Sequence, residues 1–219
     1  MMCSKVWIVS NRPFPNRVAS NPADLERLLK TYEPEHPERI YFPFWSWKVP
    51  NDLLLKCDCI GFHSTPLPFG RGGSPIQNMI RLGYQTTELC MFRMTKNFDE
   101  GEILCRREVW LKGTLGDIIS RISSNIESMI KGYEGGTIIS TGSTTDYNRV
   151  PLKFNRIVNN HLSEVDTLEQ LYDEIRMRDE EGHPKAFIWL GKFRIDFTDA
   201  FYHFDGKEPL KAKVEIYKE

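Results

Sequence analysis

The chain has 219 residues, of which 40% are hydrophobic and 27% are charged, and its formal net charge is −1. This length corresponds to one domain or to one domain with a small appendage, and the apolar fraction excludes an intrinsically disordered protein. A charge near zero argues against a surface that attracts nucleic acid or anionic membranes. No apolar run reaches the roughly 18–20 residues of a membrane span, so we expect a cytoplasmic protein with no membrane or nucleic-acid partner.

The cysteines and histidines do not show the spacing of a metal site. Cys57 and Cys59 form a single C-x-C pair without a second pair, and the five histidines lack an H-x-x-x-H spacing. We therefore expect no metal. The cysteines lie in or beside apolar segments, which is typical of small core residues in a reducing compartment.

The first 135 residues alternate between strand-like and helical segments. Five β-branched or aromatic runs predict strands, at Lys5–Ser10, Arg39–Phe42, Cys57–Phe62, Thr86–Met94 and Ile103–Trp110. Asn21-Pro22 and Ser74-Pro75 each place a capping side chain before a proline, which predicts a helix after each pair. Apolar residues at helical spacing between Leu115 and Ile130 predict the longest helix. The alternation predicts an α/β domain over residues 1–135, with a doubly wound, mostly parallel, Rossmann-like sheet.

The composition changes after Gly135-Gly136, where glycine, serine and threonine become frequent through Asn148. A helix is expected at Thr167–Arg178. Three short strands are expected after it, at Ala186–Leu190, Phe193–Phe197 and Lys211–Lys218. Residues 136–219 are therefore predicted to form a small C-terminal α+β subdomain, with a hairpin at Gly191.

The segment His63–Ile80 (HSTPLPFGRGGSPIQNMI) is the most unusual in the chain. It follows a predicted strand, so His63 is expected at the carboxyl end of that strand, where ligand crevices form in open α/β sheets. Glycines allow the backbone to approach a ligand closely, and the helix that begins after Ser74 offers free N–H groups to an anion. The segment lacks the G-K-[ST] of a phosphate-binding P-loop. A lone histidine at a strand end also fits a structural role.

A second polar segment, Asn97–Glu102 (NFDEGE), lies between two predicted strands. Its carboxylates fit an acid–base role, and by composition alone they also fit a polar β-turn. Asp99 lies 36 residues after His63.

Together these segments resemble the formyltransferase family that uses 10-formyltetrahydrofolate, which includes enzymes acting on methionyl-tRNA, glycinamide ribonucleotide and nucleotide sugars. The family reads N-x-H-x-S-x-L-P-x-x-R-G-x-x-P at a first site and D-x-G-x-I-L at a second. The matching positions are His63, Leu67, Pro68, Arg71, Gly72 and Pro75, and then Asp99, Gly101, Ile103 and Leu104. The resemblance covers about residues 39–133.

The resemblance implies formyl transfer from N10-formyltetrahydrofolate without a covalent enzyme intermediate, with His63 and Asp99 as the catalytic pair. His63 would remove the proton of the attacking amine or stabilise the oxyanion, and Asp99 would orient His63 or relay the proton. The family's catalytic asparagine, two residues before the histidine, falls on Gly61 here. Its role passes to Ser64, Thr65, Asn78, protonated His63 or a backbone N–H, or else activity is reduced or lost.

The resemblance also implies binding residues. The folate would lie against two loops, which are Phe44, Trp45, Ser46, Trp47 and Lys48, and Thr95, Lys96, Asn97, Phe98 and Asp99. Trp45 and Trp47 fit a hydrophobic plug equally well. The acceptor is expected to contact Ser64, Thr65, Arg71, Gly72, Gly73, Asn78 and Arg156, with its phosphate or nucleotide groups against Arg71, Gly72 and Gly73. Further nucleotide contacts are expected from Tyr147, Lys153, Asn155, Arg156 and Arg176, each of which also fits a solvated surface.

The C-terminal segment Thr167–Phe197 resembles the short tail of nucleotide-sugar N-formyltransferases through Ile175, Arg176, Pro184, Ala186 and Phe187. A nucleotide-linked amino sugar is therefore the expected acceptor. The alternatives are glycinamide ribonucleotide or aminoacyl-tRNA as acceptor, a non-catalytic folate- or nucleotide-binding protein, and a folate-dependent hydrolase. The aromatic residues between Phe193 and Phe204 suggest a homodimer.

Overall fold

A six-stranded sheet forms the centre of the larger part of the protein. The computed structural model describes residues 6–33, 35–138, 150–163, 165–204 and 207–218. The strand order is β2-β1-β3-β4-β6-β7. The strands are β1 (Val6–Val9), β2 (Arg17–Ala19), β3 (Arg39–Phe42), β4 (Asp58–His63), β6 (Thr86–Arg93) and β7 (Ile103–Trp110).

The sheet is mixed. Strands β2, β1, β3 and β4 run parallel, whereas β6 pairs antiparallel with both β4 and β7. A short loop joins β6 to β7, and such a loop can connect only antiparallel neighbours. The predicted α/β fold is confirmed. The predicted strands differ from those of the sheet by one residue at most at each end.

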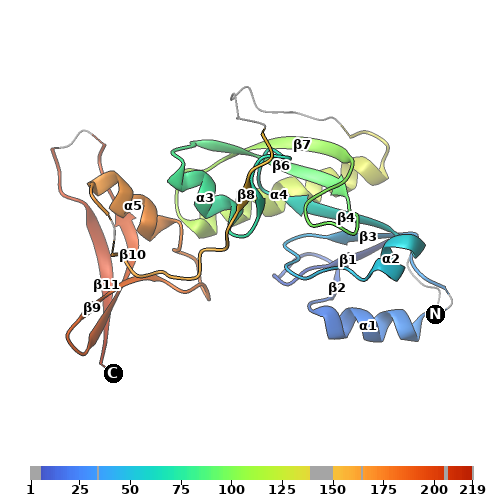
Figure 1. The fold of residues 1–219 in the computed structure, drawn as a ribbon, viewed down its shortest axis with the longest axis horizontal. Coiled ribbons are helices and arrows are strands. Elements are labelled where there is room, and N and C mark those ends of the chain that lie inside the picture. The colour runs from blue at the N-terminus through green and yellow to red at the C-terminus, as the bar shows by residue number, and fades with distance from the viewer. Residues whose placement is uncertain (1–5, 34, 139–149, 164, 205–206, 219) are drawn as a thin grey trace.

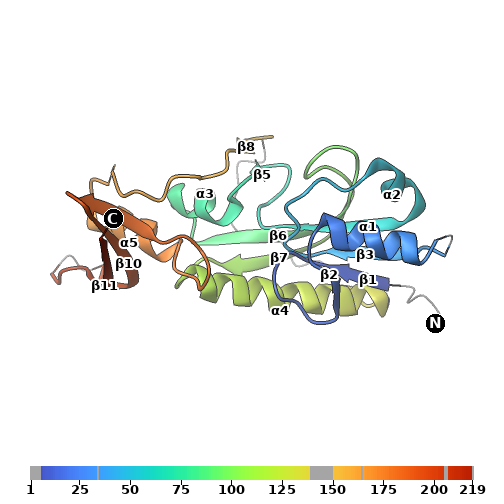
Figure 2. The same cartoon turned by 90° about the horizontal axis from the view of Figure 1, so that it is seen from below.

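Alternating side chains divide each parallel strand between two helical layers. Ile40, Phe42 and Cys59 pack on the side of α1 (Pro22–Thr31) and α2 (Asn51–Lys56). Tyr41 and Ile60 pack on the opposite side, which α4 (Leu115–Glu134) covers. Figure 2 shows α4 on one side of the sheet and α1 and α2 on the other. The period of two in a strand therefore produces the three-layer arrangement.

The helix starts follow the capping motifs with one exception. Asn21 accepts a hydrogen bond from the Asp24 N–H at 3.0 Å, and Thr114 forms a capping box with Asp117 at the start of α4. The expectation that Ser74 caps α3 (Pro75–Arg81) through its side chain is wrong. Ser74 has a φ of 49°, and its hydroxyl accepts instead from the Ile157 N–H at 3.0 Å.

The C-terminal part is a small sheet with one helix. Strands β9 (Ala186–Leu190), β10 (Phe193–Phe201) and β11 (Lys211–Lys218) are antiparallel in the order β11-β10-β9, beside α5 (Leu168–Arg176). In Figure 1 this unit lies at the opposite end of the molecule from α1 and α2. The predicted hairpin at Gly191 is present, and β10 extends four residues beyond its predicted end.

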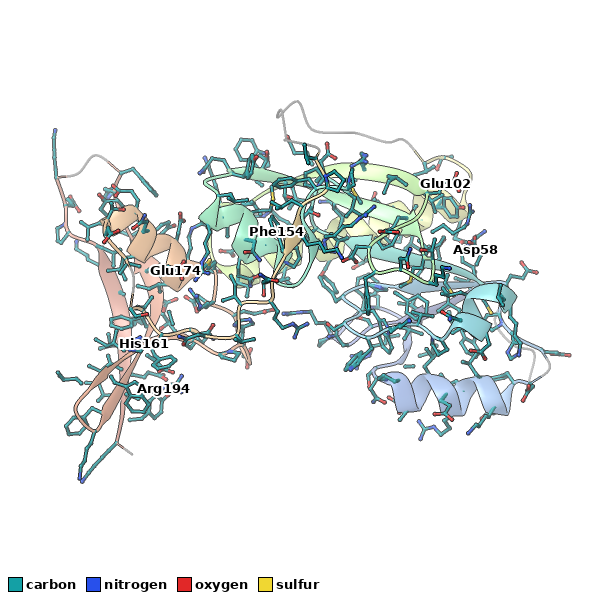
Figure 3. The ribbon with its side chains drawn as sticks, in the orientation of Figure 1. Asp58, Glu102, Phe154, His161, Glu174 and Arg194 are labelled. Carbon is teal, nitrogen blue, oxygen red and sulfur yellow. The ribbon has the colours of Figure 1, made fainter. Side chains whose placement is uncertain are left out.

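Polar contacts join the C-terminal part to the large sheet. Arg81 of α3 forms a bidentate ion pair with Glu174 of α5, at 2.6 and 2.8 Å. Glu174 lies on the side of α5 that faces α3 (Figure 3). Arg176 is buried and donates to the carbonyls of Leu111 and Gly113, which follow β7. These bonds fix α5 against the end of the sheet.

Four cysteines in the described part of the chain are buried and unbridged, namely Cys57, Cys59, Cys90 and Cys105. Burial raises the pKa of the Cys59 thiol to about 12, which makes it unreactive near neutral pH. Among the residues that the structure places, no helix has the length and hydropathy to cross a bilayer, and no group of three metal-ligating side chains converges.

Candidate active site

A cavity of about 630 Å³ lies where β1, β3 and β4 end. Its walls come from segments distant in sequence. They are Asn11 and Arg12 after β1, Phe44–Val49 after β3, His63 and Ser64, the loop Gly72–Gln77, Met94–Asp99, part of α4, Arg156–Ile157, and His183. The carboxyl ends of adjacent parallel strands are where open α/β sheets place ligands.

His63 and Asp99 face each other in this cavity. The imidazole Nδ1 lies 3.5 Å from Asp99 Oδ1, and the histidine is 7% exposed. The other ring nitrogen, Nε2, is 2.9 Å from the Gly70 carbonyl oxygen. Because a carbonyl only accepts hydrogen bonds, Nε2 carries a proton. Nδ1, the ring position left for proton exchange, therefore faces the carboxylate.

Local backbone conformation fixes the Asp99 carboxylate. Asp99 has a φ of 52°, in the left-handed region, and its Oδ2 accepts a hydrogen bond from the Gly72 N–H at 2.8 Å. Two residues later Gly101 has a φ of 139°, and a Cβ there would lie 1.9 Å from the Arg93 carbonyl oxygen. Only glycine fits this turn, which directs Asp99 toward His63.

Strained backbone is concentrated at the cavity. Phe44, Ser74 and Asp99 all have positive φ values without being glycine, and all three line the cavity. Such conformations cost about 1–3 kcal/mol each and persist where the surrounding structure holds them. At Ser74 that support is the hydrogen bond from Ile157. The clustering is a physical indication of a functional site.

Buried polar groups hold the loop after His63. Thr87 Oγ1 donates to the Ser64 carbonyl at 3.0 Å, and Cys90 Sγ lies 3.2 Å from the Thr65 carbonyl oxygen. Arg106 donates to the Leu67 carbonyl at 2.8 Å and pairs with the fully buried Glu88. Strands β6 and β7 thereby position a loop that has no regular structure of its own.

Aromatic side chains form the opposite wall. The rings of Trp45 and Trp47 are 4.8 Å apart, and Trp45 also packs on Phe42. The indole Nε1 of Trp45 is buried and has no hydrogen-bond partner within the described structure. A buried donor without a partner is costly, so this wall fits a flat ligand that carries hydrogen-bond acceptors. Phe92 and Met94 continue the apolar surface.

No side chain occupies the place of the family's asparagine at Gly61. A Cβ at Gly61 would lie 2.8 Å from the Phe92 ring and 3.1 Å from Met94 Cγ. These two apolar side chains fill the space. Of the four suggested replacements that act through a side chain, His63 and Ser64 line the cavity, whereas Thr65 and Asn78 do not. Thr65 donates to the Gly70 carbonyl, and the Asn78 amide donates to the carbonyls of Gly73, Ser74 and Asn155.

The expected binding residues divide into two groups. Those that line the cavity are Phe44, Trp45, Ser46, Trp47, Lys48, Ser64, Gly72, Gly73, Thr95, Lys96, Asn97, Phe98, Asp99 and Arg156. Arg71 lies outside and pairs with Glu100, and Lys153 and Asn155 are also outside. The expectation for Arg176 is wrong, because its guanidinium is buried against Leu111 and Gly113. Tyr147 lies outside the described residues.

Sequence reasoning missed Asn11, Arg12 and His183. Asn11 and Arg12 follow the first predicted strand, and the rule that ligands bind at the carboxyl ends of parallel strands would have identified them. No sequence motif around His183 indicates that it belongs to a binding site. It reaches the cavity through the ion pair between Arg12 and Glu180 and the hydrogen bond from its own N–H to the Glu180 carbonyl.

Comparisons with known proteins agree with this geometry. Residues 158–217 match the family model "Methionyl-tRNA formyltransferase, C-terminal domain". A solved structure, methionyl-tRNA formyltransferase from Clostridium thermocellum, is 30% identical, with 98% of this chain and 99% of that one covered and a TM-score of 0.79. A structure described as a likely sugar N-formyltransferase from Mycobacterium tuberculosis is 14% identical, over 87% of this chain and 93% of that one, with a TM-score of 0.60, and shares the fold.

Among curated proteins, methionyl-tRNA formyltransferase of Ehrlichia ruminantium (strain Welgevonden) is 26% identical over 180 residues. That alignment covers 78% of this chain and 56% of the Ehrlichia protein. The chain thus spans about half the length of the curated relatives it matches.

Proposed function

The chain belongs to the formyltransferase family, and from that premise we propose that it transfers a formyl group from N10-formyltetrahydrofolate to the primary amine of an acceptor. The observation that carries the proposal is the His63–Asp99 pair, in which His63 is buried at the end of β4 and the half-buried Asp99 faces it from the loop between β6 and β7. The pair offers a nitrogen and a carboxylate at the same point of one cavity, as a proton transfer from an amine requires.

The cavity fits a folate. Trp45, Trp47, Phe92 and Met94 offer flat apolar surface for a fused ring, and the unpartnered Trp45 N–H offers a donor to it. When bound, the folate supplies the formyl carbon. His63 would remove the proton of the attacking amine at Nδ1, and Asp99 would stabilise the resulting charge. The bond between the amine and the formyl carbon forms as the bond from that carbon to folate N10 breaks, and the proton held on His63 passes to the departing N10. With Gly61 in place of asparagine, the donors left near His63 are the Ser64 hydroxyl and backbone N–H groups of the loop.

The acceptor that we propose is an amino sugar linked to a nucleoside diphosphate. The chain as a whole is close to neutral, whereas proteins that bind RNA present a cationic surface. The product would serve glycan synthesis.

Methionyl-tRNA is the second candidate acceptor. The observation in its favour is the similarity to the Clostridium thermocellum protein, which extends over almost the whole of both chains. The match of residues 158–217 to the C-terminal model points in the same direction.

The test is a radiolabelled formyl-transfer assay with four acceptors, namely UDP- and dTDP-linked amino sugars, methionyl-tRNA and glycinamide ribonucleotide. Label on a nucleotide sugar supports the proposal, and label on methionyl-tRNA selects the second candidate. Formate release without acceptor would identify a hydrolase. Folate binding without transfer of the label would identify a non-catalytic binding protein, and both of these results overturn the proposal.

We also propose that residues 1–135 and 136–219 are two structural units and that the protein forms a homodimer. The support for the dimer is an apolar face of the small sheet. On it Leu190 pairs with Phe193, and Ile195 pairs with Ile216. Leu190 and Ile216 are more than 60% exposed. Such a face is typical of an interaction surface, and a single 25.6 kDa species in sedimentation at micromolar concentration would exclude the dimer.

A further inference from the structure

The charge inside the cavity differs from that of the whole chain. Its lining contains four cationic residues, Arg12, Lys48, Lys96 and Arg156, and one carboxylate, Asp99. The formal charge of the lining is therefore 4 − 1 = +3, with histidines neutral, against −1 for the 219 residues. A concave site with one sign of charge concentrates ligands of the opposite sign.

The four cations lie in different parts of the lining. Lys48 and Lys96 belong to the two aromatic loops that we assign to the folate. Arg12 and Arg156 come from two other segments, the turn after β1 and the segment after β8 (Lys153–Phe154). His183, from the turn after α5, lines the cavity as well, and Arg12 lies close enough to influence its charge. Arg12, Arg156 and His183 are thus not accounted for by folate binding.

Hydrogen bonds from the residues on both sides of Arg156 connect its backbone to α3 and to the loop before α3. The Asn155 carbonyl accepts from the Asn78 amide at 3.1 Å, and the Ile157 N–H donates to the Ser74 hydroxyl at 3.0 Å. Gly73 makes the approach possible, because a Cβ there would lie 2.7 Å from Arg156 Cβ. Strand β8 pairs with β5 (Arg71–Gly72) in the same stretch.

The guanidinium of Arg156, in contrast, has no partner in the described part of the protein, where no carboxylate lies within 4 Å of it. Two long-range hydrogen bonds, the pairing of β8 with β5 and a glycine thus position the backbone of Arg156, whose exposed side chain brings an unpaired charge to the cavity. An arginine held in this way is suited to bind an anion with paired N–H groups.

Arg12 and His183 are also held in position. The Arg12 guanidinium stacks on the Phe44 ring, 5.8 Å from its centroid, and pairs with Glu180. His183 Nδ1 lies 3.0 Å from the Pro184 carbonyl oxygen, so Nδ1 carries a proton and Nε2 remains available. Burial, with Arg12 and Arg178 nearby, lowers the pKa of His183, although Glu180 opposes the shift. An anion beside the ring would favour its protonated, donating form.

We infer that Arg156, Arg12 and His183 form a phosphate-binding subsite that holds the acceptor in the cavity. This inference rests on the proposed function, because it assigns the subsite to the acceptor of the formyl group. A phosphate group can come from a nucleoside diphosphate or from the backbone of an RNA end. Both present the same non-bridging oxygens to the guanidinium.

The experiment is a calorimetric titration of the full chain with two probes, UDP and the trinucleotide CCA. Each is titrated into the wild type, Arg156→Gln, Arg156→Lys and the control Arg27→Gln. Arg27 is exposed on α1 and lies far from the cavity lining. Thermal unfolding of each variant shows whether it is folded. A stable 10-formyltetrahydrofolate analogue is titrated in parallel.

We expect one of the phosphate probes to bind, and Arg156→Gln to weaken it about ten- to a hundredfold, as for loss of a charged hydrogen-bonding partner. Arg156→Lys should restore part of the affinity, and Arg27→Gln should change nothing. UDP as the bound probe identifies a nucleotide acceptor, and CCA identifies an RNA end.

Equal affinity of wild type and Arg156→Gln for the phosphate probes, or no binding of either probe, would overturn the subsite. The folate titration separates this from failure of the proposed function. A folate analogue that binds equally to wild type and Arg156→Gln, with no phosphate binding, leaves formyl transfer standing and removes the subsite. Phosphate binding that depends on Arg156, without binding of the folate analogue, would leave the subsite standing and would remove formyl transfer from the folate.

Discussion

Asp99 joins His63 to the glycine-rich loop. Its Oδ1 lies 3.5 Å from His63 Nδ1, and its Oδ2 accepts a hydrogen bond from the Gly72 N–H at 2.8 Å. One carboxylate therefore has two roles, an electrostatic one toward the imidazole and a positioning one toward the loop. Two substitutions separate these roles.

Asp99→Asn retains an oxygen that accepts from the Gly72 N–H but removes the negative charge beside His63. We expect formyl transfer to fall on the order of 10²–10⁴-fold, because proton transfer loses its charged partner, while the melting temperature stays unchanged. Asp99→Ala removes both roles, and we expect the same loss of transfer with faster amide exchange at Gly72. Steady-state kinetics and hydrogen exchange measure the two effects.

The control for these variants is His203→Gln, which alters a histidine that is half exposed and remote from the cavity lining. It should leave transfer unchanged. Full activity of Asp99→Asn would show that the charge beside His63 has no part in the reaction.

Gly61→Asn should destabilise the protein, not improve the site. The new Cβ would lie 2.8 Å from the Phe92 ring, and overpacking of this kind costs about 1–3 kcal/mol. Phe92→Ala alone removes a buried ring, and the double variant Gly61→Asn/Phe92→Ala should be more stable than the sum of the single changes predicts. Urea unfolding of the four proteins measures this coupling. Strict additivity would show that Phe92 does not fill the space at Gly61.

Gly101→Ala should disrupt the turn that carries Asp99. With a φ of 139° and a Cβ position 1.9 Å from the Arg93 carbonyl oxygen, the turn cannot accept alanine without moving. Gly191→Ala is the matched control, because Gly191 also has a positive φ, of 59°, but its Cβ would meet nothing within 4 Å and it lies outside the cavity lining. The control should lose about 1 kcal/mol of stability and retain activity. We expect Gly101→Ala to lose more stability and most of its transfer activity, and equal effects of the two changes would contradict this.

Asp58 should make the stability of the large sheet depend on pH. Its carboxylate accepts from Arg39 Nε at 3.0 Å and from Arg93 Nε at 2.8 Å, and Arg93 also contacts Glu102. Burial opposes ionisation, but the two guanidinium groups outweigh it and lower the pKa of Asp58. A lowered folded-state pKa means that the stabilisation is complete above the unfolded value near ~3.9 and is lost as the pH falls through the folded value.

Asp58→Asn should therefore cost about 1 kcal/mol in the free energy of unfolding at pH 7, and the wild type and variant should converge as the pH falls through the lowered folded-state pKa of Asp58. Urea titrations at pH 7, 5 and 3 measure the difference. Asp52→Asn, at the exposed start of α2, serves as the control. A difference that does not change with pH would show that the ion pairs of Asp58 do not contribute.

The sequence pattern predicted secondary structure correctly where the conformation of a segment depends on residues close to it in sequence. The run Arg39–Phe42 and the capping residue Asn21 lie in elements whose neighbours in sequence also determine their conformation. The segment Asn51–Lys56 was missed because a six-residue helix after Pro50 has too few positions to show helical periodicity.

The cavity depended more on contacts between distant residues. Ser74 has the sequence of a helix cap, but its hydroxyl accepts a hydrogen bond from the N–H of Ile157, 83 residues later. The backbone of Ser74 is in the left-handed region. Arg156 reaches the site through the pairing of β5 with β8, and His183 reaches it through Arg12 and Glu180. No spacing within the chain encodes such contacts, whereas the two sequence motifs led to His63 and Asp99, which both line the cavity.

The most direct test of the account is a calorimetric titration of the full chain with a stable 10-formyltetrahydrofolate analogue, on wild type and on Trp45→Phe. Trp45→Phe keeps the apolar wall and removes the buried N–H that has no partner. We expect saturable binding of the analogue with one site per chain. The affinity should be about three- to tenfold lower in Trp45→Phe because one hydrogen bond is lost. No binding to the folded wild type at millimolar analogue would contradict the account.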